Sequence, residues 1–194
     1  MGRLGQVFYP SNQLTLLRLV FIPFLILSIL YEHFGTAFLL ALLAGMSDGL
    51  DGLLARRLRQ QTTLGAYLDP IADKLLLSSC FVALGVERQL PLWLVILVLS
   101  RDVLMLATGL VMILTTSLRS FPPTLYGKAN TVAQVLTVLV TLWVLWRPVD
   151  WIYWLQQAGI FSTASFTVIS GLHYAWRTAG RLHHLERTSG NDRR

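Results

Sequence analysis

The chain has 194 residues, of which 54% are hydrophobic and only 13% are charged, and its mean hydropathy is +0.58. A chain with so few charged residues lacks the polar surface of a soluble globule, and its apolar stretches approach the ~20 residues that cross a bilayer. We therefore predict a polytopic integral membrane protein. The formal net charge of +6 is interpreted as membrane orientation and contact with anionic lipid, rather than as nucleic-acid binding.

Six apolar stretches follow one another along the chain, and each is long enough to form a membrane-spanning helix. The predicted helices cover residues 14–31, 36–58, 64–86, 91–116, 124–146 and 151–181. The predicted fold class is therefore all-α, a polytopic integral membrane protein with six transmembrane helices. Because the connections are short, we expect one membrane domain over residues 1–184, followed by a polar, disordered tail over residues 185–194.

Arg18 and the lack of a small-residue cleavage site distinguish the first stretch from a cleaved signal peptide, so we expect it to be retained. Of the sixteen Lys and Arg residues, only Arg88 and Arg147 fall at the end of the predicted helices that is opposite the termini. The positive-inside rule then places both termini and the connections near residues 56–63 and 117–127 in the cytoplasm. The expected location is the inner (plasma) membrane of a bacterium.

Four of the ten acidic residues are concentrated in the second and third predicted helices. Asp48 and Asp51 are three positions apart on one helix, and Asp69 and Asp73 are four apart on the next, so each pair projects from one helical face. The short connection predicts that the two helices are antiparallel neighbours and that both pairs converge near the cytoplasmic end. Converging carboxylates, each costing at least ~2.5 kcal/mol at membrane depth, need a cation among them. Oxygen ligands favour Mg²⁺ or Mn²⁺, which indicates phosphate chemistry at a membrane surface.

Two other interpretations of these charges remain open. The aspartates can form a structural ion-pair network with Arg56, Arg57 and Lys74, although insulated carboxylates are an expensive way to hold helices together. They can also line the pathway of an ion or proton transporter, which predicts repeated halves and broken helices that the sequence does not show.

Two small residues in the same helices are expected to serve packing. Gly45 begins a small-x-x-x-small pattern with Gly49 and is expected to let a neighbouring helix approach closely; the alternative is that it lets a flat ligand approach. Cys80 is the single cysteine of the chain and lies in an apolar stretch, so it is expected to pack as a small hydrophobic residue.

The aspartates belong to a longer pattern. It reads Asp48-x-x-Asp51-Gly52-x-x-Ala55-Arg56, then eight residues, then Gly65-x-x-x-Asp69-x-x-x-Asp73. This pattern closely resembles the signature of the CDP-alcohol phosphatidyltransferases, and all eight fixed positions match. The resemblance extends over nearly the whole chain, through Asn12-x-x-Thr15-x-x-Arg18, Ser100-Arg101-Asp102 and Gly127-Lys128-x-x-Thr131-x-x-Gln134. One departure is that the usual Pro-Asn pair of the family appears here as Pro10-Ser11-Asn12.

The resemblance implies that the protein transfers a phosphatidyl group from CDP-diacylglycerol to an alcohol and releases CMP, with two divalent ions, Mg²⁺ or Mn²⁺, as cofactors. It implies metal ligation by Asp48, Asp51, Asp69 and Asp73, and contacts to CDP from Gly52, Ala55, Arg56 and Gly65. Asp73 is then the expected general base for the acceptor hydroxyl. The implied partners are membrane lipids and these substrates, and homodimers are common in the family.

The acceptor is expected to carry a phosphate. Arg101, Lys128 and Arg177 lie in three different predicted helices and are candidates for one anion-binding pocket. The competing interpretations are that Arg101 pairs with Asp102 or a motif aspartate, and that the other two reach the lipid headgroups. Within the family, the preferred prediction is a phosphatidylglycerophosphate synthase that uses glycerol 3-phosphate. A CMP-forming cardiolipin synthase that uses phosphatidylglycerol ranks nearly equal. The reason is that phosphatidylglycerophosphate synthases usually have Arg-Glu where this chain has Arg101-Asp102, and an arginine where it has Gly109.

Overall fold

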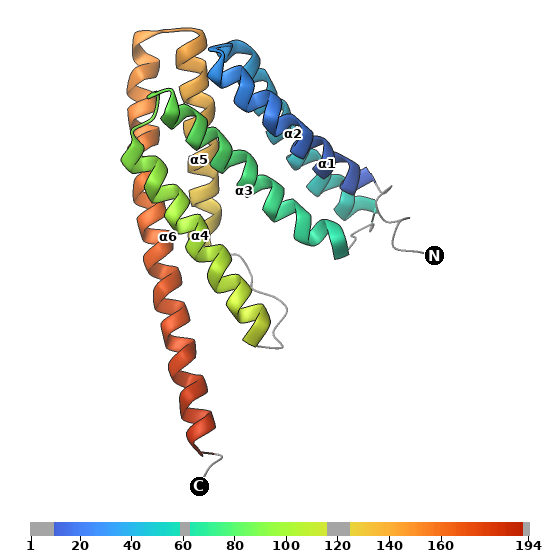
Figure 1. Ribbon diagram of the computed structural model, residues 1–194, viewed down its shortest axis with the longest axis vertical. Helices are drawn as coiled ribbons and strands as arrows, with labels where there is room; N and C mark the ends of the chain where they lie inside the picture. The colour runs from blue at the N-terminus through green and yellow to red at the C-terminus, as the bar shows by residue number, and fades with distance from the viewer. Residues whose placement is uncertain (1–9, 59–62, 116–124, 192–194) are drawn as a thin grey trace.

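The computed structural model describes the backbone of residues 10–58, 63–115 and 125–191, and the side chains of residues 18–47, 72–107 and 127–173. All regular secondary structure in these ranges is α-helical (Figure 1). The helices are α1 (Pro10–Leu30), α2 (Phe34–Leu58), α3 (Thr63–Val86), α4 (Leu92–Thr115), α5 (Leu125–Trp146) and α6 (Asp150–Asn191). The all-α prediction and the order of six helices are therefore confirmed.

Successive helices run in alternating directions, so the start of α1, the end of α2 and the start of α3 lie at the same end of the bundle (Figure 1). The turns at the opposite end are sharp. Arg88, which follows α3, has a left-handed backbone with φ 56°, and Glu32 after α1 has φ 58°. The Gln89 amide donates to the Leu84 carbonyl at 2.8 Å, the hydrogen bond of a Schellman cap. Such a cap stops the helix abruptly and returns the chain to the bundle.

Helix α1 packs against both α2 and α3, and α5 packs most extensively against α6. In the part of the chain that the structure describes, α2 contacts mainly α1 and α5, whereas α3 contacts α1, α4 and α5. Helices α2 and α3 are antiparallel, as predicted (Figure 1). Within these residues α2 and α3 are not among one another's main contacts, and that they are neighbours around the motif stays a prediction. A short connection fixes the direction of two helices but not which neighbour each apolar face meets.

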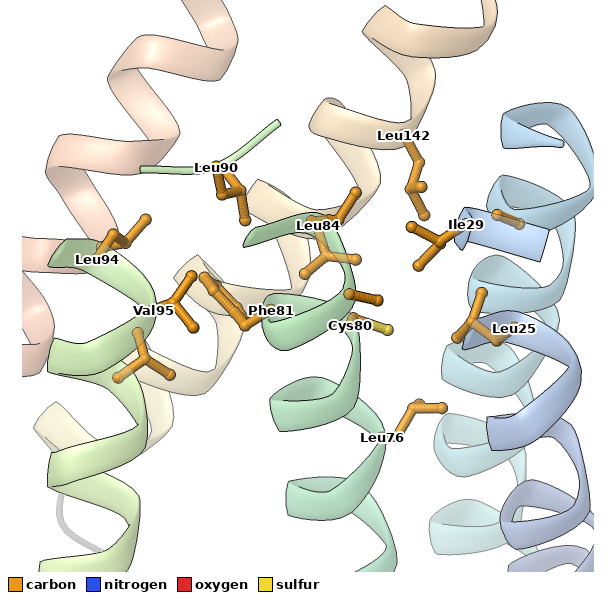
Figure 2. Close-up of a cluster of buried hydrophobic side chains, with 14 of the residues drawn as sticks. Leu25, Ile29, Leu76, Cys80, Phe81, Leu84, Leu90, Leu94, Val95 and Leu142 are labelled. Carbon is orange, nitrogen blue, oxygen red and sulfur yellow. The ribbon is translucent and has the colours of Figure 1, made fainter. Parts of the chain in front are cut away.

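Helix α3 forms the centre of the hydrophobic core. Figure 2 shows Cys80, Phe81 and Leu84 of α3 between residues of α1 on one side and of α4 on the other. Phe81 and Leu84 are completely buried, and Cys80 is buried with its thiol free. The prediction that Cys80 packs as a small hydrophobic residue is confirmed. Close packing of this kind gives the buried side chains more van der Waals contacts than lipid chains would give them.

Large apolar side chains also cover the outside of the bundle. Exposed examples from the six helices include Phe24, Leu43, Leu75, Ile96, Leu136 and Leu172. Soluble monomers rarely expose apolar surface on this scale. By length and composition, one stretch in the described parts of the chain, Gly127–Trp146 of α5, meets the requirement for a membrane span; Arg18–Leu30 and Phe34–Ser47 are shorter apolar stretches. The assignment of all six helices as membrane spans stays a prediction.

Helix α6 is longer than expected. It continues to Asn191, so the polar residues 185–191, which we expected to be disordered, are helical. Residues 192–194 lie outside the described part of the chain. The segment contains Leu, Arg and Glu, which favour helix, and no proline. Polarity alone was therefore a poor guide to disorder here.

Candidate active site

The motif aspartates lie on two helices, near the end of α2 and in the first half of α3, at the same end of the bundle (Figure 1). The structure places Asp48 and Asp51 in α2, and Asp69 and Asp73 in α3. Of these four side chains, that of Asp73 is within the described part. Three of the predicted metal ligands and all four predicted CDP contacts have helical backbones but side chains outside the described residues: Asp48, Asp51, Asp69, Gly52, Ala55, Arg56 and Gly65. Their convergence on one point stays a prediction.

Asp73 forms an ion pair with Arg18 of α1. Arg18 Nη1 donates to Asp73 Oδ1. The two side chains differ sharply in exposure, since that of Arg18 is 2% exposed and that of Asp73 is 36% exposed. The guanidinium is therefore inside the bundle, whereas the carboxylate reaches its surface. This pairing joins residues that are 55 positions apart, and sequence spacing gave no sign of it.

A cavity of about 90 Å³ opens beside this pair, between α1, α2, α3 and α5. Its polar lining consists of Arg18, Asp73 and Thr131, and the remaining walls are apolar, formed by Ala41, Ala44, Gly45, Leu76, Leu77, Cys80, Val135, Val138 and Leu139. Helices α2 and α3 thus face one another across a cavity instead of packing. The site combines the Arg18–Asp73 pair and Thr131 with a lining that is otherwise apolar, an arrangement that suits an amphipathic ligand.

Gly45 has a different role from the one expected. A Cβ atom built on Gly45 would meet nothing within 4 Å, and the residue lines the cavity. Its lack of a side chain is therefore not needed for close helix packing, and the expectation that it serves packing is wrong. The small residue instead leaves the cavity open on the side of α2.

A second group of charges lies next to Asp73 along α3. Lys74 Nζ donates to Asp102 Oδ1 at 2.5 Å, and Arg101 Nη1 donates to the same oxygen at 2.7 Å. Arg101 Nη2 continues to Ser170 Oγ of α6 at 2.8 Å. These contacts join α3, α4 and α6. Within the described residues, Lys74 therefore pairs with Asp102, and not with Asp73 as the structural alternative required.

The candidate acceptor residues have unequal surroundings. Arg101 is 6% exposed, and two of its three nitrogens bind Asp102 and Ser170, as the structural interpretation of this residue predicted. Lys128, near the start of α5, is exposed. Arg177 lies in α6, and its side chain is outside the described residues. Among the described side chains, the hydrogen-bond partners of Arg101 are Asp102 and Ser170, so an anion pocket shared with Lys128 stays a prediction.

The donor chemistry agrees with a hard cation. Among the side chains that the structure describes, no group of three or more His, Cys, Asp and Glu residues forms a metal centre, but three of the four motif aspartates are outside that set. The described carboxylate, that of Asp73, is partly exposed at a cavity. Carboxylate oxygen is the ligand that Mg²⁺ and Mn²⁺ prefer in proteins.

Comparison with known proteins extends these observations over most of the chain. The family model described as CDP-alcohol phosphatidyltransferase matches residues 8–169. A protein of Salmonella choleraesuis (strain SC-B67) is 34% identical over 176 residues, which cover 87% of this chain and 94% of that protein. A protein of Escherichia coli (strain K12) is 34% identical over 168 residues, which cover 83% and 90% of the two chains. Both relatives are named CDP-diacylglycerol--glycerol-3-phosphate 3-phosphatidyltransferase. With its motif aspartates on two helices and its family match from residue 8 to residue 169, this chain belongs to the CDP-alcohol phosphatidyltransferase family.

Proposed function

We propose that the protein transfers the phosphatidyl group of CDP-diacylglycerol to glycerol 3-phosphate and releases CMP. The observation that carries this proposal is the carboxylate of Asp73, which is held by Arg18 at a largely apolar cavity between helices that bear the family motif. The names of the two relatives support the choice of glycerol 3-phosphate over phosphatidylglycerol.

In this reaction a bond forms between the acceptor hydroxyl oxygen and the phosphorus of the phosphatidyl group. The bond from that phosphorus to CMP breaks, and the hydroxyl loses its proton. Asp73 is the proposed base that accepts this proton, because it is the described carboxylate that reaches the cavity. Most of the residues that line the cavity are apolar, and such a lining would limit the access of bulk water to the reacting groups.

The motif aspartates Asp48, Asp51, Asp69 and Asp73 would hold two divalent ions, Mg²⁺ or Mn²⁺. Such ions, when bound, neutralise the pyrophosphate of the donor and stabilise the departing CMP. Gly52, Ala55, Arg56 and Gly65 would contact CDP. The three small residues leave room for the nucleotide, and Arg56 offers a planar set of donors to phosphate.

Lys128 is the acceptor residue that the structure supports best, since it is exposed and belongs to a helix that lines the cavity. Arg101 is less available to bind the acceptor phosphate, because Asp102 and Ser170 already bind two of its nitrogens. Arg177 completes the proposed anion pocket. We place all six helices across a bacterial inner membrane with both termini in the cytoplasm. The alternating helix directions and the apolar outer surface support this placement.

The experiment that tests the proposal supplies the purified protein with CDP-diacylglycerol, Mg²⁺ or Mn²⁺, and one acceptor at a time. Glycerol 3-phosphate should yield phosphatidylglycerophosphate and CMP, and EDTA should stop CMP release. Cardiolipin from phosphatidylglycerol, with no product from glycerol 3-phosphate, would replace the proposal with the cardiolipin synthase alternative. Activity only with inositol phosphate, serine or choline would show that both acceptor assignments are wrong.

A further inference from the structure

Arg18 is a buried charge in an apolar helix. It lies eight residues from the start of α1, at the beginning of the apolar stretch Arg18–Leu30, and it is 2% exposed. An arginine in such a place is costly unless it is paired, and Arg18 forms an ion pair with Asp73. The partner is thus the same carboxylate that the proposed function uses as base and metal ligand.

The packing of α1 against α3 fixes this pair. Leu25 and Ile29 follow Arg18 by seven and eleven positions and lie on the same face of α1. Leu76 and Cys80 follow Asp73 by three and seven positions on one face of α3. These four apolar residues belong to one buried cluster (Figure 2). Two helices that interlock along these faces hold the guanidinium at a defined place relative to the carboxylate.

The shape of the guanidinium suits it to orient the Asp73 carboxylate, and not only to balance its charge. Its donors form a rigid planar fork, whereas a lysine supplies a mobile point charge. A carboxylate that must serve both a metal and an acceptor hydroxyl needs a defined orientation. Arg18 and Asp73 line the same cavity, so the donor that orients Asp73 is built into the wall of the site.

We propose that Arg18 is a positioning residue that acts through Asp73: it holds this carboxylate at the cavity in the orientation that metal binding and proton transfer require. The effect of Arg18 on kcat rests on the proposed function. Its effect on metal affinity does not need turnover and can be measured separately. A purely structural pair would stabilise the contact of α1 with α3 without affecting either quantity.

The test compares Arg18→Gln and Arg18→Lys with the unmodified protein in detergent micelles or nanodiscs. Mn²⁺ affinity is measured by electron paramagnetic resonance titration, and kcat and KM are measured from CMP release. Loss of an orienting partner typically costs about 10- to 100-fold in metal affinity or activity. We expect Arg18→Gln to weaken Mn²⁺ binding and to lower kcat by such factors, and Arg18→Lys to restore part of both. If Arg18 were only a counter-charge, its removal would strengthen Mn²⁺ binding, because one repelling cation would be gone.

A double-mutant cycle separates action through Asp73 from a general effect on the fold. In the Asp73→Asn background, adding Arg18→Gln should change the Mn²⁺ dissociation constant by less than about twofold, the usual scatter between independent sites. The double variant removes both charges of the Arg18–Asp73 pair, so neither is left in place without the other, and this variant should fold. Arg88→Gln, which removes an exposed charge at the end of α3, is the matched control and should match the unmodified protein.

Equal effects of Arg18→Gln in the two backgrounds would overturn the proposal, as would unchanged or tighter Mn²⁺ binding in the single variant. If Arg18→Gln does not fold, Arg18→Lys decides: it should weaken Mn²⁺ binding, and affinity like that of the unmodified protein overturns the proposal. If the unmodified protein releases no CMP with any acceptor, the proposed function fails, while the Mn²⁺ titrations still decide the role of Arg18.

Discussion

Replacing Asp102 with asparagine should destabilise the bundle, because Lys74 and Arg101 would lose the carboxylate charge that they share. Asp102 Oδ1 accepts hydrogen bonds from Lys74 at 2.5 Å and from Arg101 at 2.7 Å, so one carboxylate connects α3 to α4. The side chains are 6% exposed for Asp102, 7% for Arg101 and 27% for Lys74. Asp102→Asn keeps the shape of the side chain but removes the charge that buried Arg101 and partly exposed Lys74 share.

The expected loss follows from the cost of breaking a buried pair. Removing one partner of such a pair costs about 3–5 kcal/mol, because an uncompensated charge stays buried. Lys74 is partly exposed and can turn toward water, so we expect the lower end, about 3 kcal/mol of unfolding free energy. Arg101 remains anchored to Ser170, which limits its relaxation. The unfolding free energy is measured in mixed micelles by titration with SDS, followed by tryptophan fluorescence.

Asp150→Asn provides the control, since Asp150 is an exposed carboxylate in the first turn of α6. It should cost no more than about 1 kcal/mol, the value of a favourable charge at a helix N-terminus. Adding Lys74→Met to Asp102→Asn should recover part of the loss, because a neutral side chain replaces one of the two unpaired cations. A loss below about 1 kcal/mol for Asp102→Asn would refute this reasoning, since it would show that water already compensates these charges.

Three further predictions concern metal binding, the acceptor and helix packing. Asp69→Asn should abolish CMP release while membrane insertion, measured by fractionation, stays normal; normal turnover would contradict the metal assignment. Lys128→Ala should raise the KM for glycerol 3-phosphate about ten- to a hundredfold, because it removes a charge-assisted contact of about 1.5–3 kcal/mol. The KM for CDP-diacylglycerol should stay unchanged. An unchanged KM for glycerol 3-phosphate would exclude Lys128 from the pocket. Gly159→Ala would place a Cβ 2.9 Å from Thr137 Oγ1 and should lower the unfolding free energy in SDS titrations by about 1–3 kcal/mol. A Cβ at Gly171 would meet nothing within 4 Å, so Gly171→Ala should be neutral or stabilising. Equal effects of the two variants would contradict the packing argument.

The sequence alone determined the helices and the family of the protein. The lengths of the apolar stretches predicted six helices, and for the first five of them the ends differ from the structure by a few residues at most. These features are local, because an apolar stretch of about 20 residues and its flanking turns specify a helix without reference to the rest of the chain. The spacing of Asp69 and Asp73 likewise places both on one face of α3.

The tertiary structure alone decided the partners of the charged residues. The sequence offered Lys74 as a partner for the motif aspartates, but Lys74 pairs with Asp102, and Arg18 pairs with Asp73. Arg56 and Arg57, offered for the same role, have side chains outside the described residues. Gly45 was expected to pack against a helix, and it lines a cavity instead. Helical periodicity fixes which side chains share a face, but the face that each one meets depends on how the helices cross. The crossing angles depend on many packing contacts between residues that are distant in sequence, such as Leu25, Cys80 and Phe81. No local sequence pattern specifies those contacts.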